Sequence, residues 1–248
     1  MNKVKDNFSA QPGMYARYRP VYPPELFAFL MSLVKNKELA WDVGTGNGQV
    51  AVQLSRHFKK VLATDISPQQ ISKAPVRENI IYKVERAEIT TFSNDFFDLV
   101  TVAQAVHWFE FEPFYTEVIR TSKRGGIIAI MGYGLMKSGS SVDEILHHFY
   151  TGIIGQYWDE ERKYIDENYE TIPFPFDEIP APEFTIRCEW TLADLLGYLE
   201  TWSAVQHYKT AQLTDPVKII ETELQKVWSA DEVKHIEFPV LLKVAAVK

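Results

Sequence analysis

Three glycines stand at alternate positions in the stretch Asp42-Val43-Gly44-Thr45-Gly46-Asn47-Gly48, directly after an apolar run that starts at Leu39. Glycine adopts backbone conformations that are closed to other residues, and it lets a ligand approach the main chain closely. Between a strand and a helix, such a loop binds a nucleotide-like group at the edge of a sheet. The stretch therefore predicts a cofactor site, while the glycines alone leave a simple tight turn as the alternative.

The second chemically informative residue is Asp65, an acid at the end of the next apolar run. A carboxylate offers two acceptor oxygens, which suits the two neighbouring hydroxyls of a ribose. The alternative is that Asp65 caps the helix that follows it, although Ser67 can do so instead.

The glycine spacing bears on the class of cofactor. A dinucleotide fingerprint places glycines at relative positions one, three and six. Here they stand at 44, 46 and 48, so the third comes one residue early. Asp42 adds a negative charge, which is unfavourable for a pyrophosphate and favourable for a cationic ligand. An NAD(P)-dependent oxidoreductase remains the alternative enzyme, because Asp65 would suit its ribose equally well.

The elements that position these residues alternate along the chain. Nearly all-apolar strands separated by helices indicate a parallel sheet covered on both faces, an α/β fold. Right-handed crossovers place the loops that follow the strands along one edge, where ligands bind. We expect strands at residues 39–43, 61–65, 80–84, 97–102, 127–131, 184–190 and 238–247, a turn at 124–126, and helices at 25–34, 50–58, 68–74, 114–121, 142–158, 191–204 and 215–228.

Composition excludes several classes of function. The chain of 248 residues is 46% hydrophobic and 24% charged, as in a globular protein. A net charge of −7 with no long basic run disfavours nucleic acid as the main partner. The single cysteine, Cys188, excludes an intrachain disulfide and a thiolate metal cluster. The sequence shows neither a signal peptide nor an apolar run of about 18 residues, so we expect a cytoplasmic protein without a membrane partner.

The glycine loop, from Asp42 to Gly48, resembles the first motif of class I S-adenosylmethionine-dependent methyltransferases. Asp65 matches the acid of that family that binds ribose, and Ala87-Glu88 resembles the position where adenine is held. Residues 98–105 resemble the fourth-strand motif, and residues 123–126 resemble the turn before strand five. Within the family, Tyr15 and residues 18–23 and 103–109 are most similar to the small-molecule branch that includes trans-aconitate methyltransferases.

The resemblance implies a Rossmann-like class I methyltransferase fold. Its sheet has seven strands, mostly parallel, with helices on both faces and a lid or insertion between strands five and six. The chain would form one domain, residues 1–248. Its parts would be an N-terminal lid and helix at 1–35, a cofactor-binding core at 36–133, an insertion that shapes the acceptor site at 134–182, and the final strands and helices at 183–248.

The implied activity is transfer of a methyl group from S-adenosylmethionine to a small molecule, first of all a carboxylic acid oxygen, with S-adenosylhomocysteine as the product. The cofactor already carries an activated methyl group, so the protein mainly binds it, aligns an acceptor and excludes water. No metal is expected. A non-catalytic domain that binds the cofactor and works through a partner stays open as the alternative.

The resemblance also implies roles for individual residues. The loop glycines would lie against the methionine part of the cofactor, and Asp42 would orient its ammonium group. Ile66 would contact the adenine, and Glu88 would lie near its exocyclic amine. Arg19 would pair with the cofactor carboxylate or, alternatively, would hold the N-terminal segment to an acid on the sheet domain. The full expected set is Tyr15, Arg19, Asp42, Gly44, Thr45, Gly46, Asp65, Ile66, Ala87, Glu88, Ala103 and Gln104.

On the acceptor side, His107 follows the fourth strand at the ligand edge. It could orient the acceptor or take its proton near neutral pH, and the alternative is that it fixes Trp108 or the loop. A carboxylate acceptor needs no base, because it is ionised at pH 7. Trp108, Tyr133 and Trp202 are expected to line the acceptor side, with ordinary core packing as the alternative for each.

Overall fold

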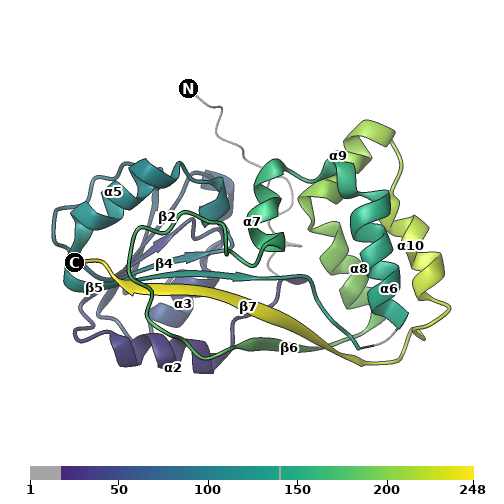
Figure 1. The fold of residues 1–248 in the computed structure, drawn as a ribbon, viewed down its shortest axis with the longest axis horizontal. Helices are drawn as coiled ribbons and strands as arrows, with labels where there is room; N and C mark the ends of the chain where they lie inside the picture. The colour runs from purple at the N-terminus through teal and green to yellow at the C-terminus, as the bar shows by residue number, and fades with distance from the viewer. Residues whose placement is uncertain (1–17, 140) are drawn as a thin grey trace.

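The centre of the molecule is a seven-stranded sheet in the order β3-β2-β1-β4-β5-β7-β6, seen in a computed structural model that describes residues 18–139 and 141–248 (Figure 1). The strands are β1 (Leu39–Val43), β2 (Lys60–Asp65), β3 (Ile80–Val84), β4 (Phe97–Ala103), β5 (Ser122–Tyr133), β6 (Thr185–Trp190) and β7 (Lys234–Ala246). Strands β1 to β5 pair in parallel, whereas β7 pairs antiparallel with both β5 and β6. The predicted α/β fold with a mostly parallel seven-stranded sheet is confirmed.

Helices cover both faces of the sheet, with α5 on one face and α2 and α3 on the other (Figure 1). Alternate residues of β5 show why: Ile127 and Ala129 join one buried apolar cluster, and Ile128 and Ile130 join a second. Since successive side chains point to opposite faces, an all-apolar strand needs cover on both sides. The helices are α2 (Pro24–Leu33), α3 (Gln49–Leu54), α4 (Pro68–Ile71), α5 (Phe111–Thr121), α6 (Ser141–His148), α7 (Lys163–Asp166), α8 (Leu192–Glu200), α9 (Ser203–Gln212) and α10 (Pro216–Leu224).

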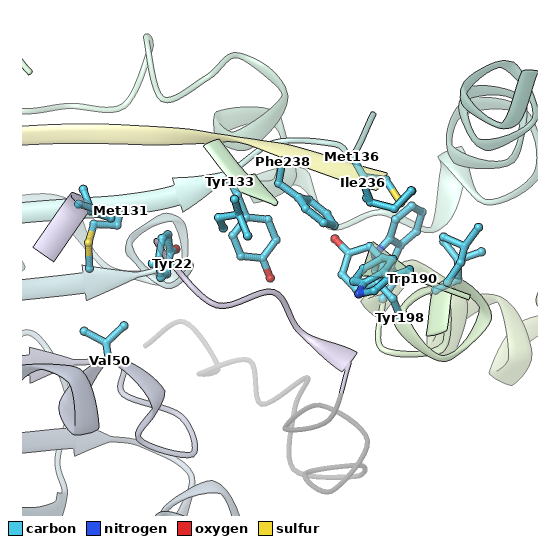
Figure 2. Close-up of a cluster of buried hydrophobic side chains, with 14 of the residues drawn as sticks. Tyr22, Val50, Met131, Tyr133, Met136, Trp190, Tyr198, Ile236 and Phe238 are labelled. Atoms are coloured by element: carbon cyan, nitrogen blue, oxygen red, sulfur yellow. The ribbon is translucent and has the colours of Figure 1, made fainter. Parts of the chain in front are cut away.

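Helices α6, α8, α9 and α10 gather beyond the carboxyl ends of β4 and β5, and the long strand β7 runs between this group and the sheet (Figure 1). Apolar packing is continuous across the junction. Tyr133 at the end of β5 contacts Phe238 of β7, with ring centroids 5.5 Å apart, and Phe238 contacts Trp190 and Tyr198 at the same distance (Figure 2). The helical group is therefore anchored to the edge of the sheet at which ligands of such folds bind.

The expected turn at residues 124–126 is wrong, because this segment is part of β5. Phe97 of β4 pairs with Ser122, and Leu99 then pairs with Ile127, so the register shifts between the two pairs. Gly125 adopts a φ of 76°, a conformation that glycine accepts readily. The extra residues form a bulge inside the strand, and the strand starts earlier than its apolar run.

Two predicted helices are interrupted. The helix expected at 142–158 ends at His148 and continues as a π-helical turn, η2 (Phe149–Ile153), and a 3₁₀ turn, η3 (Gly155–Tyr157). Glycines at 152 and 155 weaken a regular helix there. The helix expected at 191–204 is two helices, α8 and α9, which separate at Thr201 and Trp202. Two further 3₁₀ turns, η1 (Val106–Trp108) and η4 (Glu160–Arg162), follow β4 and precede α7.

Candidate functional site

The glycine loop lies between β1 and α3, and all three of its glycines have positive φ: 62° at Gly44, 55° at Gly46 and 83° at Gly48. A Cβ on Gly44 would lie 2.7 Å from the Cβ of Ala105, and one on Gly48 would lie 2.5 Å from the hydroxyl of Tyr82. A Cβ on Gly46 would meet no described atom within 4 Å. The outer glycines therefore allow close packing, and the middle one leaves main chain that a ligand can reach.

Asp65 ends β2, next to this loop. One of its oxygens, Oδ2, accepts a hydrogen bond from the backbone N–H of Gly46, and the other, Oδ1, accepts one from the N–H of Ser67, both at 2.8 Å. Ser67 itself caps α4, since its hydroxyl accepts from the N–H of Gln70 at 3.2 Å. Ser67, and not Asp65, is therefore the residue that caps α4. Ile66, between the two, is 37% exposed, so its side chain is open to a ligand.

Asp42 is buried at the end of β1 under the loop. Its carboxylate accepts hydrogen bonds from the hydroxyl of Thr45 at 2.5 Å and from that of Thr101 at 2.8 Å. Burial raises the pKa of Asp42 to about 6, although both hydrogen bonds oppose the rise and the nearby Asp65 adds to it. A buried acid with such a pKa favours a cation that comes close to it.

Ala87 and Glu88 follow β3. Ala87 is buried, and the carboxylate of Glu88 accepts hydrogen bonds from the guanidinium of Arg86 and from the backbone N–H of Glu110, both at 3.1 Å. Since Glu110 is the N-cap residue of α5, Glu88 joins the loop after β3 to the start of that helix. A contact of Glu88 with adenine stays a prediction.

Ala103 is the last residue of β4, and Gln104 follows it at the same edge of the sheet. Gln104 has a φ of 52°, which is uncommon for a residue other than glycine. Its backbone N–H donates to the carbonyl of Met131 at 2.9 Å, and its side-chain amide donates to the carbonyl of Tyr133 at 3.2 Å. Its amide oxygen is buried without a hydrogen-bond partner in the described part of the chain. Strained backbone and an unused buried acceptor are features of ligand sites.

Arg19 joins the N-terminal segment to the rest of the molecule. It donates to the hydroxyl of Tyr133 at 3.2 Å and to the carbonyl of Thr201 at 3.0 Å, and its guanidinium lies 5.5 Å from the centre of the Tyr198 ring. These two contacts, with a hydroxyl and a backbone carbonyl, tie the chain at Arg19 to β5 and to the end of α8. Pairing of Arg19 with the cofactor carboxylate stays a prediction. Tyr15 lies outside the described residues.

His107 lies on η1 and is 5% exposed. Its ring is 4.9 Å from that of Trp108 and 6.4 Å from that of Tyr169, measured between centroids. Burial, together with the positive charge of Arg162, lowers the pKa of His107 to about 3. The imidazole is therefore uncharged at neutral pH and too weak a base to take a proton there, which favours the orienting role over proton transfer.

A set of aromatic side chains and one arginine gathers beside His107, and we call it the acceptor-side cluster. Trp202 contacts Tyr150 at 5.7 Å and Trp158 at 5.4 Å between ring centroids, and Arg162 lies 4.7 Å from the centre of the Trp158 ring. The members are His107, Trp108, Tyr150, Trp158, Arg162, Tyr169, Tyr198 and Trp202.

The sequence prediction identified only three members of this cluster: His107, Trp108 and Trp202. Arg162 and Tyr169 lie in a charged, irregular segment between η3 and β6, where no periodicity marks a buried face. Tyr169 is nonetheless fully buried, and its hydroxyl has no hydrogen-bond partner within residues 18–139 and 141–248. The one available signal was the frequency of aromatic residues in that segment.

Comparisons with known proteins give a consistent result. A family model described as "Methyltransferase domain" matches residues 41–130. A candidate methyltransferase of Dictyostelium discoideum is 34% identical over 248 residues, which cover 97% of this chain and 94% of that protein. A solved structure from Anaeromyxobacter dehalogenans, described as a candidate type II methyltransferase, is 32% identical with a TM-score of 0.86 and covers 93% of this chain and 98% of that chain.

A more distant likeness concerns the fold alone. A candidate methyltransferase structure from Bacillus halodurans is 17% identical, with a TM-score of 0.52, and covers 91% of this chain and 99% of that one. In the described residues, no helix is both long and apolar enough to cross a membrane.

Proposed function

The chain belongs to the class I S-adenosylmethionine-dependent methyltransferases, and from this premise we propose that it methylates a carboxylate oxygen of a small molecule. The acceptor oxygen would attack the methyl carbon while the carbon–sulfur bond breaks and the sulfur leaves as a neutral thioether. The products are a methyl ester and S-adenosylhomocysteine. When bound, the cofactor supplies an electrophilic methyl group, so the protein contributes binding, alignment and exclusion of water.

The residues around the glycine loop fit this cofactor. The open main chain at Gly46 would lie against its methionine part, and the buried Asp42, at the base of the loop, would orient the ammonium group. The two carboxylate oxygens of Asp65, held beside the loop by the N–H groups of Gly46 and Ser67, would accept from the two ribose hydroxyls. Ile66 would pack on the adenine. The remaining proposed contacts are Tyr15, Arg19, Gly44, Thr45, Ala87, Glu88, Ala103 and Gln104.

One observation carries the choice of a carboxylate acceptor: apart from the cation Arg162, which cannot act as a base, the titratable groups of the acceptor-side cluster are uncharged at neutral pH. The pKa of His107 is lowered to about 3, and burial raises the pKa values of Tyr150, Tyr169 and Tyr198 well above the usual range. An alcohol or ammonium acceptor would need a base to take its proton. A carboxylate is already ionised and needs none.

The same cluster suits a small molecule with an apolar body. Trp202 is buried among aromatic rings, and Tyr133 lies at the carboxyl end of β5 with its hydroxyl accepting from Arg19. The resemblance of residues 103–109 to the branch that includes trans-aconitate methyltransferases also supports a small acid. Trp108, Tyr133 and Trp202 would contact the acceptor, with His107 orienting it, and residues 134–182 would shape its site.

Methyl transfer from isotopically labelled S-adenosylmethionine tests the proposal. The purified protein is incubated with matched sets of small carboxylic acids, alcohols and amines that share the same carbon skeletons. We expect label only in acids, in a product that mild alkali releases as methanol because it is an ester. Label in the alcohols or amines, stable to alkali, would contradict carboxylate methylation and leave the methyltransferase assignment in place.

A further inference from the structure

Arg162 presents a guanidinium that the fold uses only in part. Its side chain is 18% exposed, and its Nε donates to the hydroxyl of Tyr150 at 2.7 Å and lies 3.4 Å from Oδ1 of Asp166. Among the residues that the structure describes, neither terminal nitrogen, Nη1 or Nη2, donates a hydrogen bond, and the only side-chain donor of Arg162 in use is Nε. These two nitrogens form the edge of the group that binds a carboxylate in a bidentate manner.

The surroundings hold this guanidinium in one orientation. Tyr150 accepts from the Nε of Arg162 and donates to Asp166 at 2.5 Å, so the three groups form a chain of hydrogen bonds. The guanidinium also lies 4.7 Å from the centre of the Trp158 ring and 5.4 Å from that of Tyr150. A cation fixed at one edge and flanked by aromatic rings is prepared to bind an anion at its other edge.

The location of Arg162 connects it to the proposed acceptor site. Turn η4, which ends at Arg162, packs against η1, which carries His107. The positive charge of Arg162 also lowers the pKa of His107 and opposes the rise in the pKa values of Tyr169 and Tyr198, so the cation lies within electrostatic reach of all three. The acids of its own segment are Asp159, whose backbone carbonyl accepts from the N–H of Arg162, Glu160 and Glu161 of η4, and Asp166, whose side chain is 46% exposed.

The chemistry of methyl transfer decides which anion Arg162 can serve. A carboxylate that accepts a methyl cation loses its negative charge on the way to the ester. An arginine paired with that same carboxylate would stabilise the starting state more than the transition state and would slow the reaction. Arg162 can help only if it holds an anionic group that keeps its charge throughout.

We propose that Arg162 binds a second acid group of the acceptor, one that is not methylated, and so selects diacids over otherwise identical monoacids. The inference rests on the proposed function, because it places the acceptor in the cluster around His107. Arg162 is then a specificity-determining residue, and the aromatic rings of Trp158 and Trp202 contact the carbon body between the two acid groups.

The test compares pairs of acids that differ in one carboxylate: 4-carboxyphenylacetate with phenylacetate, and adipate with hexanoate. Their dissociation constants are measured by calorimetry on the protein saturated with S-adenosylhomocysteine, so that no methyl transfer is needed. We expect wild type to bind a diacid at least about tenfold more tightly than its monoacid. In Arg162→Gln this preference should fall by about 10- to 100-fold, as expected for a lost charge-assisted pair, with monoacid affinity little changed.

Three variants separate recognition from structure. Arg162→Lys keeps the charge without the planar pair of donors, so part of the preference should remain. Tyr150→Phe removes the hydrogen bond to Nε and leaves the guanidinium, so most of the preference should remain. Arg187→Gln is the matched control, because Arg187 is 74% exposed on β6 and pairs with Glu237. If Arg162→Gln does not fold, the diacid preference of the other two variants tests the inference. A preference that is reduced in Arg162→Lys and mostly kept in Tyr150→Phe supports it, and an unchanged preference in Arg162→Lys overturns it.

The outcomes separate this inference from the proposed function. Diacid binding that depends on Arg162, without methylation of any acid, supports the inference and contradicts carboxylate methylation. Methylation of monoacids and diacids at equal rates, unchanged in Arg162→Gln, supports the proposed function and overturns the inference. Failure of all four acids to bind wild type also overturns the inference.

Discussion

Asp65 and Gly46 are joined by a hydrogen bond of 2.8 Å, from the backbone N–H of the glycine to the carboxylate of the acid. The acid that ends β2 therefore also holds the loop that follows β1, and the position proposed for ribose lies next to the open main chain of Gly46. One side chain thus supports the shape of the cofactor loop and offers acceptors to the cofactor.

Replacement of Asp65 should weaken cofactor binding. In Asp65→Ala we expect the affinity for S-adenosylhomocysteine to fall by roughly 1–3 kcal/mol, because charge-assisted hydrogen bonds to ribose are lost together with the brace on Gly46. Calorimetric titration measures the loss, and circular dichroism checks the fold. Asp65→Asn, which keeps one acceptor oxygen for the loop, should lose less. Unchanged affinity in a folded Asp65→Ala protein would remove Asp65 from the site.

Gly46 and Gly125 form a matched pair for testing the open main chain. Both have positive φ, 55° and 76°, and neither would bring a Cβ within 4 Å of another described atom. Alanine should therefore destabilise each site by a similar amount, on the order of 1 kcal/mol from backbone strain. Only Gly46→Ala should also lose cofactor affinity, by at least tenfold, because its methyl group occupies the proposed ligand position. Thermal unfolding and calorimetry on both variants measure the two effects, and equal affinity in both would contradict the placement.

The cofactor side was predictable from the sequence because its signals are local. The strands at 39–43 and 80–84 have the predicted bounds, and the glycines of the loop and Asp65 are separated by regular elements that bring them together. The bulge in β5 was not predictable in the same way. The bulge depends on how β5 pairs with β4. The apolar run that starts at Ile127 contains no information about that register.

The acceptor side depends on contacts between distant segments. Arg162 and Tyr169 approach His107 only because the irregular chain after η3 folds back onto η1, and burial in that segment follows no helical or strand period. Burial also changes the chemistry: the sequence suggests an ordinary histidine at 107, whereas its surroundings hold the pKa at about 3.

The raised pKa of Asp42 predicts a pH-dependent stability. Its folded-state value of about 6 exceeds the ordinary 3.8, so the folded protein binds a proton more tightly than the unfolded chain does. This group's stabilising contribution is complete below pH 3.8 and is lost as the pH rises to about 6, with a total change of roughly 3 kcal/mol. Urea unfolding of wild type and Asp42→Asn across this range should give a difference that shifts in favour of the variant as the pH rises. A constant difference would contradict the prediction.

Cofactor affinity should show the opposite trend with pH. Ionised Asp42 attracts the ammonium group of S-adenosylhomocysteine, so wild-type affinity should increase as the pH rises through about 6 and then level off. Calorimetry between pH 5 and pH 8 measures this, and Asp42→Asn should bind more weakly with a flatter profile. A wild-type profile identical in shape to that of the variant would remove Asp42 from contact with the ammonium group.

The side chain of His107 should affect kcat without changing its protonation state between pH 6 and pH 8. Because its imidazole is uncharged at neutral pH, we expect the kcat of His107→Gln to fall about 10- to 100-fold through poorer alignment, with unchanged affinity for S-adenosylhomocysteine. The kcat profiles of both proteins should have the same shape between pH 6 and pH 8. An inflection near pH 6.5 that is present in wild type and absent in the variant would instead assign proton transfer to His107.

Calorimetric titration of the protein with S-adenosylhomocysteine, with NADH as the control ligand and Gly46→Ala as the control protein, tests the central claim most directly. We predict binding at micromolar concentration or tighter for S-adenosylhomocysteine, much weaker binding in Gly46→Ala, and none for NADH. Binding of NADH with no binding of S-adenosylhomocysteine, in protein shown to be free of bound cofactor, would contradict the account.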